Sequence, residues 1–526
     1  MYRRSLLAAG AAAVASPALA QPAGSRVLKF APQSDLTVID PVVTTAYVTR
    51  NHALLIYDQL YGYDETLSPT PQMVEGHMVE DDGKRWTFRL REGQTFHDGT
   101  PVRGLDCIAS IKRWAARDSL GQAMMARLAE MSSPDDRTFV IRLNRPYGPM
   151  LDTLAKIGPS ALFIMPARIA DASDPFTAIR EVVGSGPFRW KADERVVGAR
   201  VVYERFAGYK PRETGQIAWS AGPKITHFDR VEWTVMPDAA TKAAALANGE
   251  IDWWENPPND LLPLLRRSRE IVTASASPLG TVGSGIFNCL QPPFDRPAVR
   301  RAVVGAMSQA DFMIAAAGTE PGIYRDNVGI FTPGTPLANE AGMEIITRPR
   351  DLERSKRELR EAGYNGERVV LMGASDQPAL TALSEVGRDL LVKIGMNVDF
   401  QVMDWGSVVQ RRASREPVEK GGWSMFHTTW FGIDSVNPLG YQVLRSNGAD
   451  AWFGWPSAPK AEELRMAWID APDLDSQKRI AAEFQGEILQ QATYLPTGQY
   501  FSKTAHRRNI TGVLEGIIAF WNVRRI

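Results

Sequence analysis

The 526-residue sequence has little cysteine and no surplus of either charge. Two cysteines in a chain of this length exclude a small fold that depends on disulfides. Because 60 Lys and Arg balance 60 Asp and Glu, the composition predicts no nucleic-acid partner. No apolar run reaches the ~18 residues of a membrane-spanning helix. What remains is typical of a soluble folded protein, with 44% apolar and 23% charged residues and length for roughly three to four domains.

The motifs of the common enzyme classes are also missing. The chain has no G-x-x-x-x-G-K-[ST] loop, no H-E-x-x-H, no C-x-x-C and no G-x-S-x-G. Its six histidines include no pair at metal-ligand spacing. We therefore predict no catalytic residues, no resident metal and no cofactor. A secreted hydrolase that uses scattered carboxylates such as Asp376, Asp404 and Asp434 stays an alternative, which cleavage of candidate peptides would reveal.

The N-terminus has the layout of an export signal. Arg3 and Arg4 precede an apolar run from Leu6 to Ala15, and Ala18-Leu19-Ala20 is the small-x-small pattern of a signal-peptidase site. We predict a signal peptide over 1–20 and a periplasmic mature protein. The paired arginines leave both the general secretory and the twin-arginine routes open. In the exported chain we expect Cys107 and Cys289 to be buried free thiols, with a disulfide between them as the alternative.

Helical and strand patterns alternate along most of the chain, which predicts an α/β fold with mixed sheets flanked by helices. The clearest unit has an apolar strand over Arg368–Gly373, an amphipathic helix over Ala379–Ile394 and an alternating strand over Asn397–Met403. This order predicts a right-handed parallel crossover. Ligands collect beyond the carboxyl ends of such strands, here at Ala374–Asp376 and at Asp404-Trp405.

Two further segments have clear local patterns. Asp82-Gly83 and Asp98-Gly99 are turn signals on either side of the strand Arg85–Leu90, so we predict an antiparallel unit within Val79–Pro101. Asp351–Ala362 begins with a capping residue and ends at a glycine, which predicts a solvated surface helix.

Residues 80–114, EDDGKRWTFRLREGQTFHDGTPVRGLDCIASIKRW, resemble the signature of the family 5 extracellular solute-binding proteins, the peptide and nickel receptors of ABC importers. Other pieces of the family pattern follow in order: Ile39-Asp40-Pro41, Gly184–Phe188, Gly249–Asp252, Pro293–Asp295, Val299–Ala302 and Glu361–Tyr364. The resemblance implies a two-lobe periplasmic binding protein fold with an extra inserted domain. Lobe one would comprise 21–60, 180–280 and 491–526, the inserted domain 61–179, and lobe two 281–490.

The resemblance also implies a ligand-binding aspartate. In the family's peptide receptors, the aspartate three residues before an Asp-Pro or Asn-Pro step binds the α-ammonium of the ligand, and Asp434 precedes Asn437-Pro438 in this way. A carboxylate in a closed cleft suits an ammonium because their hydrogen bond is charge-assisted. The alternative interpretation is structural, with Asp434 opening a turn that Asn437-Pro438 completes.

His427 supports a second reading of the same stretch. Phe426–Trp430 resembles the segment that carries the direct protein ligand in the family's nickel receptors, and one imidazole can complete the coordination of a chelated metal. A hydrogen-bonded core histidine is the alternative. The only metal contact that the sequence suggests is therefore His427, under a nickel-chelate function.

Aromatic and basic residues near this stretch are further candidates. Trp405 and Trp430 are the predicted pocket tryptophans, because aromatic walls bury carbon chains and stack on cations. Tyr47 is included because its segment lines the cleft in relatives. A peptide ligand would also require an arginine for its carboxylate, and the sequence does not separate the three candidates Arg411, Arg412 and Arg445.

We therefore predict a periplasmic substrate-binding protein, not an enzyme. It would capture a peptide or a similar amine-bearing small solute, close over it and deliver it to the ABC permease in the inner membrane. We expect a monomer. A receptor for a nickel chelate is the alternative within the same architecture.

Overall fold

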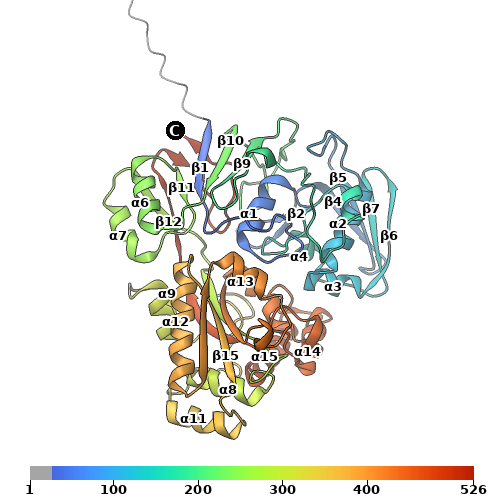
Figure 1. The fold of residues 1–526 in the computed structure, drawn as a ribbon. Coiled ribbons are helices and arrows are strands. Elements are labelled where there is room, and N and C mark those ends of the chain that lie inside the picture. The colour runs from blue at the N-terminus through green and yellow to red at the C-terminus, as the bar shows by residue number, and fades with distance from the viewer. Residues whose placement is uncertain (1–25, 65) are drawn as a thin grey trace, which may run out of the picture.

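The computed structural model describes residues 26–64 and 66–526, and it has two lobes, one above the other in Figure 1. The upper lobe is built on a seven-stranded sheet and the lower lobe on a six-stranded sheet. A four-stranded sheet lies beside the upper lobe. The predicted signal peptide over 1–20 falls outside the described residues. Within the described ranges, no helix combines the length and the apolar character needed to cross a bilayer.

The upper lobe, lobe one, has a mixed sheet in the order β12-β19-β11-β1-β10-β9-β8. The strand β1 pairs in parallel with β10 and β11, and the pairs farther from the centre are antiparallel. The strands of this sheet are β1 (Val27–Ala31), β8 (Phe188–Trp190), β9 (Arg200–Arg205), β10 (Arg230–Thr234), β11 (Trp253–Trp254), β12 (Ile271–Ser275) and β19 (Lys503–Arg507). The helices are α1 (Tyr47–Ile56), α6 (Ala239–Asn248) and α7 (Leu262–Arg266), and a ribbon pairs β20 (Ile510–Thr511) with β21 (Arg524–Arg525).

The inserted domain contains the antiparallel sheet β4-β5-β7-β6. The hairpin β4–β5 confirms the antiparallel unit expected near Arg85–Leu90, and its turn contains Asp82 and Gly83 with positive φ. The strands are β2 (Tyr61–Tyr63), β3 (Pro69–Pro71), β4 (Val74–Glu80), β5 (Arg85–Leu90), β6 (Leu128–Asp135) and β7 (Thr138–Leu143). The helices are α2 (Gly104–Ala115), α3 (Ser119–Met125), α4 (Met150–Ala155) and α5 (Ala167–Ala170).

The lower lobe, lobe two, has the sheet order β14-β18-β13-β17-β15-β16. Its strands are β13 (Thr281–Phe287), β14 (Tyr324–Arg325), β15 (Arg368–Ala374), β16 (Asn397–Met403), β17 (Met425–Phe431) and β18 (Leu495–Tyr500). The helices are α8 (Pro297–Ala306), α9 (Gln309–Ala317), α10 (Glu344–Thr347), α11 (Leu352–Glu361), α12 (Pro378–Lys393), α13 (Trp405–Arg411), α14 (Pro459–Ile469) and α15 (Leu474–Gln491).

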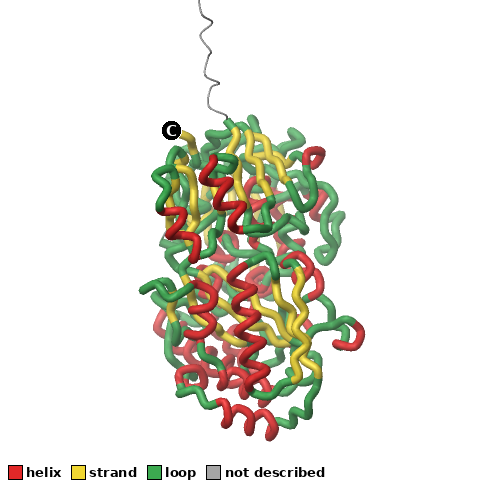
Figure 2. The backbone as a smooth tube through the Cα atoms, turned by 60° about the vertical axis from the view of Figure 1, so that its left-hand side comes forward, coloured by secondary structure: helices red, strands yellow, loops and turns green. Residues whose placement is uncertain are grey.

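The crossover predicted from the sequence is present in this lobe. The strands β15 and β16 are parallel, and the intervening α12 packs across them and β17, where Figure 2 shows helix lying over strands. The surface helix is also confirmed as α11, whose start is capped by Asp351 Oδ1 accepting from Arg354 N at 2.9 Å.

The chain passes between the lobes twice, at residues 276–280 and 501–502. Strand β18 pairs with β13 and β14 inside the lower sheet, so lobe two extends to Tyr500. The predicted boundary at 490/491 is therefore wrong by one strand. The apolar run that follows α15 gave no indication of which lobe's sheet it would join, because both sheets offer apolar neighbours.

The inserted domain is tied to both lobes. Most of its buried apolar residues share one core cluster with lobe two, and others, such as Ile157 and Phe163, belong to the main cluster of lobe one. A buried ion pair connects it to lobe one, since Arg113 of α2 donates to Asp40 at 2.7 and 3.2 Å. Both cysteines are free as predicted, with Cys107 buried and Cys289 partly exposed.

Candidate functional site

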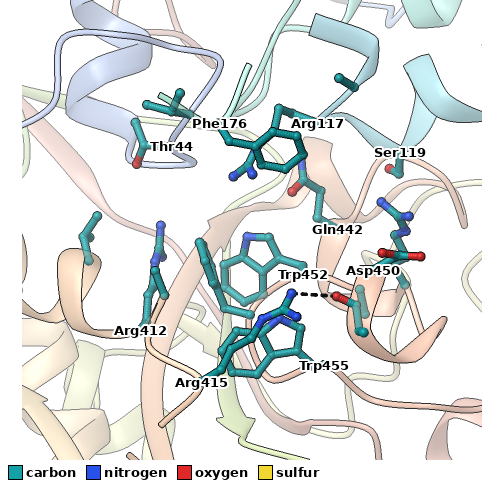
Figure 3. Close-up of a pocket in the computed structure, with 18 of the residues that line it drawn as sticks. Thr44, Arg117, Ser119, Phe176, Arg412, Arg415, Gln442, Asp450, Trp452 and Trp455 are labelled. Atoms are coloured by element: carbon teal, nitrogen blue, oxygen red, sulfur yellow. Dashed lines mark hydrogen bonds between the residues drawn. The ribbon is translucent and has the colours of Figure 1, made fainter. Parts of the chain in front are cut away.

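A cavity of about 660 Å³ lies between the lobes, and we call it the interlobe cavity. Figure 3 shows side chains of the inserted domain and lobe one facing those of lobe two across it. Its volume is within the ~300–1,000 Å³ typical of small-molecule sites. The lining residues are Val38, Val43 and Thr44 from lobe one, Ala116, Arg117, Ser119, Gln122 and Phe176 from the inserted domain, and Val409, Gln410, Arg412, Ala413, Arg415, Gln442, Arg445, Ala449–Phe453 and Trp455 from lobe two.

One wall of the interlobe cavity is aromatic. Trp452 and Trp455, in the loop that follows β17 in the sheet, face the cavity (Figure 3). Trp430, on β17, packs behind Trp452 with ring centroids 5.3 Å apart. Trp405, at the start of α13, lies behind Arg412, whose guanidinium is 5.8 Å from its ring centroid. The two predicted pocket tryptophans therefore support this wall and do not line the cavity.

Arg412 is the most enclosed cation of the cavity, with 2% of its surface exposed. Its Nη2 donates to Thr45 Oγ1 of lobe one at 3.0 Å, and its Nε has no acceptor among the described residues. Its guanidinium lies 4.7 Å from the ring centroid of Phe453 and 5.2 Å from that of Trp452. Burial lowers its pKa to about 9. A buried guanidinium with free donors suits an anionic group of a ligand.

The structure separates the three arginines that the sequence could not. Arg411 donates to Gln401 and to the carbonyls of Gly421 and Gly422, so its donors serve the fold. Arg412 and Arg445 both line the cavity. Arg411 and Arg412 face different surroundings because they are consecutive residues at the end of α13, and consecutive helical residues point in directions about 100° apart.

Asp434 and Tyr47 are brought together across the lobes. Asp434 lies in the 3₁₀ turn Gly432–Ser435 after β17, and the hydroxyl of Tyr47, at the start of α1, donates to its Oδ2. Phe431 N in turn donates to Tyr47 Oη at 2.6 Å. In this closed arrangement Asp434 is not among the residues that line the interlobe cavity, and Tyr47 lines a smaller pocket with Glu255.

The Asp434 carboxylate is buried, and burial raises its pKa to about 6. The Tyr47 hydrogen bond and the nearby charges of Lys156 and Arg50 oppose that rise. No Lys or Arg of the described residues forms an ion pair with it within 4.0 Å. Gly158 covers it so closely that a Cβ there would lie 1.8 Å from Oδ1, which only glycine permits.

The side chain that holds the turn after Asp434 is Asn437, and not Asp434 as the structural alternative supposed. Asn437 Oδ1 accepts from Leu439 N at 2.9 Å and from Gly440 N at 2.8 Å. The turn therefore depends on Asn437, and the Asp434 carboxylate is bonded to the hydroxyl of Tyr47 instead.

His427 lies elsewhere on the same strand. Its imidazole packs beneath α12 and α9, where a Cβ on Gly387 would be 2.2 Å from the ring and the Phe312 centroid is 5.7 Å away. Burial lowers its pKa to about 3, so the ring is neutral. It lines neither cavity between the lobes, and the described residues contain no group of three His, Cys, Asp or Glu that could hold a metal.

The carboxylates of the hydrolase alternative have local roles. Asp376 Oδ1 accepts from Trp405 N at 2.7 Å, and Asp404 caps α13 by accepting from Ser407 N at 2.9 Å. Both lie at the carboxyl ends of β15 and β16, as the crossover predicted. The oxygens of Asp376 and Asp404 are engaged in holding the backbone, and Asp434 is bonded to Tyr47.

Sequence reasoning missed several residues of the cavity. Arg117 and Phe176 of the inserted domain lie opposite the aromatic wall (Figure 3). Trp452 also lines the cavity and was not among the predicted pocket tryptophans. The run Trp452-Phe453-Gly454-Trp455 was a usable signal, because adjacent large aromatics in a loop need a surface to cover. Nothing in the local sequence marked Arg117 or Phe176.

Comparisons with known proteins agree with this architecture. A probable peptide ABC transporter periplasmic-binding protein of Sinorhizobium fredii is 37% identical, with 100% of this chain and 98% of that protein covered. A glutathione-binding protein of Pectobacterium atrosepticum is 28% identical over 94% of this chain and 90% of its own length. The fold matches an ABC transporter-associated periplasmic binding protein of Helicobacter pylori in complex with a peptide, at a TM-score of 0.78, 22% identity and 95% and 98% coverage.

The family model for the bacterial extracellular solute-binding proteins, family 5, matches residues 68–452. That range includes most of the inserted domain, a large part of both lobes and most of the residues that line the interlobe cavity. Proteins of this family bind solutes for ABC importers, in keeping with two lobes that meet around a cavity. The chain belongs to the bacterial extracellular solute-binding proteins of family 5.

Proposed function

We propose that this protein is exported to the periplasm with a cleaved signal peptide, and that it captures a peptide or a similar amine-bearing small solute there as a monomer. The solute then passes to the permease of an ABC importer. The observation that carries the proposal is the interlobe cavity, whose lining comes from lobe one, the inserted domain and lobe two. The relative from Sinorhizobium fredii, named as a probable peptide-binding protein, supports the choice of solute.

Binding would work through closure of the lobes. Tyr47 bonds to Asp434, and Arg412 bonds to Thr45, only when lobe one and lobe two are in contact. A solute that touches both lobes favours this closed form by the difference between its affinities for the closed and open forms. The two short crossing segments, 276–280 and 501–502, are the natural hinge.

Asp434 and Arg412 would recognise the two ends of a peptide. When the lobes are open, Tyr47 is apart from Asp434 and the carboxylate is free, and in the closed complex the solute's ammonium would take the place of the Tyr47 hydroxyl on Asp434. Arg412 has donors available for a carboxylate. Each interaction pairs a charge with its opposite in a place that excludes water.

The test is to identify the solute that the protein retains. Protein purified from the periplasm is unfolded in denaturant, the released solutes are analysed by mass spectrometry, and the refolded protein is titrated with them by calorimetry. We expect an intact solute with a free amine, and weaker binding to Asp434→Asn than to the matched control Asp389→Asn, whose carboxylate is exposed on α12 and pairs with Lys393. A solute without an amine, or its conversion to product during incubation, would overturn the proposal. Titration with a nickel–histidine complex tests the metal alternative.

A further inference from the structure

The interlobe cavity has an excess of positive charge. Four arginines line it, and Asp450 is the single acidic side chain among its lining residues. Three of the arginines come from lobe two and one from the inserted domain, and Figure 3 shows Arg117 on the opposite side from Arg412 and Arg415. The four are Arg117, Arg412, Arg415 and Arg445.

These four arginines form no ion pair with any residue that the structure describes. None of them is within 4.0 Å of a carboxylate oxygen in the ranges 26–64 and 66–526, although many arginines elsewhere are paired, as in Arg113–Asp40. Arg412 and Arg445 each have a buried Nε without an acceptor there. Arg415 donates only to the carbonyl of Ala449, at 2.8 Å.

Burial makes three of these cations costly. Arg412 is buried and Arg117 and Arg445 are partly buried, so each loses hydration that only an opposite charge replaces fully, whereas Arg415 is exposed. In keeping with this, burial lowers the pKa values of Arg117, Arg412 and Arg445, and nearby carboxylates oppose the shift only at Arg117 and Arg445. An anionic solute offsets this cost, and the guanidinium fork can bind each carboxylate with two parallel hydrogen bonds.

We propose that the solute of this protein carries at least two anionic groups, one held by Arg412 or Arg445 in lobe two and another by Arg117 in the inserted domain. Its apolar portion lies against Trp452 and Trp455 between them. The inference rests on the proposed function and narrows it, because a peptide with neutral side chains has only one anionic group. Acidic peptides and similar polyanionic amino-acid derivatives are the class that fits.

The test compares solutes that differ by one charge. The tripeptides Ala-Glu-Ala and Ala-Gln-Ala have the same shape, and a phosphoserine tripeptide tests phosphate as the second anion. We expect calorimetry to give a dissociation constant for Ala-Glu-Ala about 10- to 100-fold below that for Ala-Gln-Ala, the range of a charge-assisted hydrogen bond. The difference should shrink as salt rises.

Charge variants assign the effect to the cavity. Of Arg412→Met and Arg117→Met, the variant that removes the partner of the glutamate side chain should lose most of the preference for Ala-Glu-Ala, and the other should bind both tripeptides more weakly. No change in either variant would overturn the inference. Arg117 is only partly buried, so its variant keeps the test valid if loss of Arg412 impairs folding. Arg357→Met is the matched control, because Arg357 is exposed on α11 at the far end of lobe two, and it should keep the full preference.

The outcomes separate this inference from the proposed function. Equal affinity for Ala-Glu-Ala and Ala-Gln-Ala overturns the inference and leaves a peptide receptor in place. If neither tripeptide binds, the number of anionic groups on the solute released by denaturation decides whether the inference holds. A solute with two or more anionic groups but no amine upholds the inference and overturns the proposed function, whereas a solute with fewer than two anionic groups overturns the inference.

Discussion

Asp434→Asn should make the protein more stable and its binding weaker. The carboxylate is buried, accepts a hydrogen bond from Tyr47 and has no cation bonded to it in the described parts of the chain. Asparagine has the same size, so it fits beneath Gly158, and its side-chain oxygen can accept the same hydrogen bond. The substitution therefore removes a buried negative charge while it leaves the packing in place.

The size of the effect follows from the pKa of this carboxyl group. Burial raises the pKa from 3.8 to about 6, so the folded state binds the proton more tightly than the unfolded state. Stability should consequently fall as pH rises from about 4 to 6 and then stay level. A shift of about two units corresponds to about 3 kcal/mol, or about 3 °C in Tm for a chain of this length.

The assay is thermal or urea unfolding of both proteins between pH 4 and pH 8. The variant should be more stable by up to about 3 kcal/mol at pH 8 and equal to the wild type near pH 4. Buried groups such as His52 titrate in both proteins, so they cancel in the difference. Tyr47→Phe provides a check. It removes a hydrogen bond that lowers the Asp434 pKa, so the stability of this variant should depend on pH more strongly than that of the wild type.

Asp434→Asn should also bind amine-bearing solutes at least about tenfold more weakly than the wild type does, because the ammonium loses its ionic partner. If the substitution raises stability and lowers affinity, the charge of Asp434 serves the ligand and not the fold. A fall in stability at pH 8 together with unchanged affinity would refute the reasoning and return Asp434 to a structural role.

Two other substitutions test the remaining assignments. Arg113→Met leaves Asp40 buried without its cation, so the free energy of unfolding measured in urea should fall by about 3–5 kcal/mol, and a loss below about 1 kcal/mol would contradict the role of this pair. His427→Leu should leave calorimetric binding of a nickel–histidine complex unchanged, and it should reduce the loss of stability below pH 6.5, because burial lowers the His427 pKa to about 3 and the wild type resists protonation there. Loss of nickel binding in this variant would instead assign the metal to His427.

Local sequence patterns were sufficient for the elements that bury one face. The crossover β15–α12–β16 was predicted because its apolar residues repeat with the period of a strand, then of a helix, then of a strand. The helix α11 was predicted from its cap at Asp351, and the hairpin β4–β5 from its Asp-Gly turn. The family pattern added the two-lobe arrangement, which no periodicity contains.

The same patterns did not determine which side chains face the cavity. His427 is in the same stretch as Asp434 but packs under α12, and Trp405 and Trp430 stand behind the aromatic wall. Strand β18 joined lobe two because its hydrogen-bonding partners, β13 and β14, lie there.

The sequence by itself determined the crossover, the surface helix and the hairpin, the export signal as a prediction, and the family, because each depends on residues close together in the chain or on the order of short motifs. Only the tertiary structure brought Tyr47 to Asp434 and gathered Arg117 with Arg412 around one cavity. These pairs are hundreds of residues apart, and their charges act through space, where burial and the distance between atoms decide their chemistry.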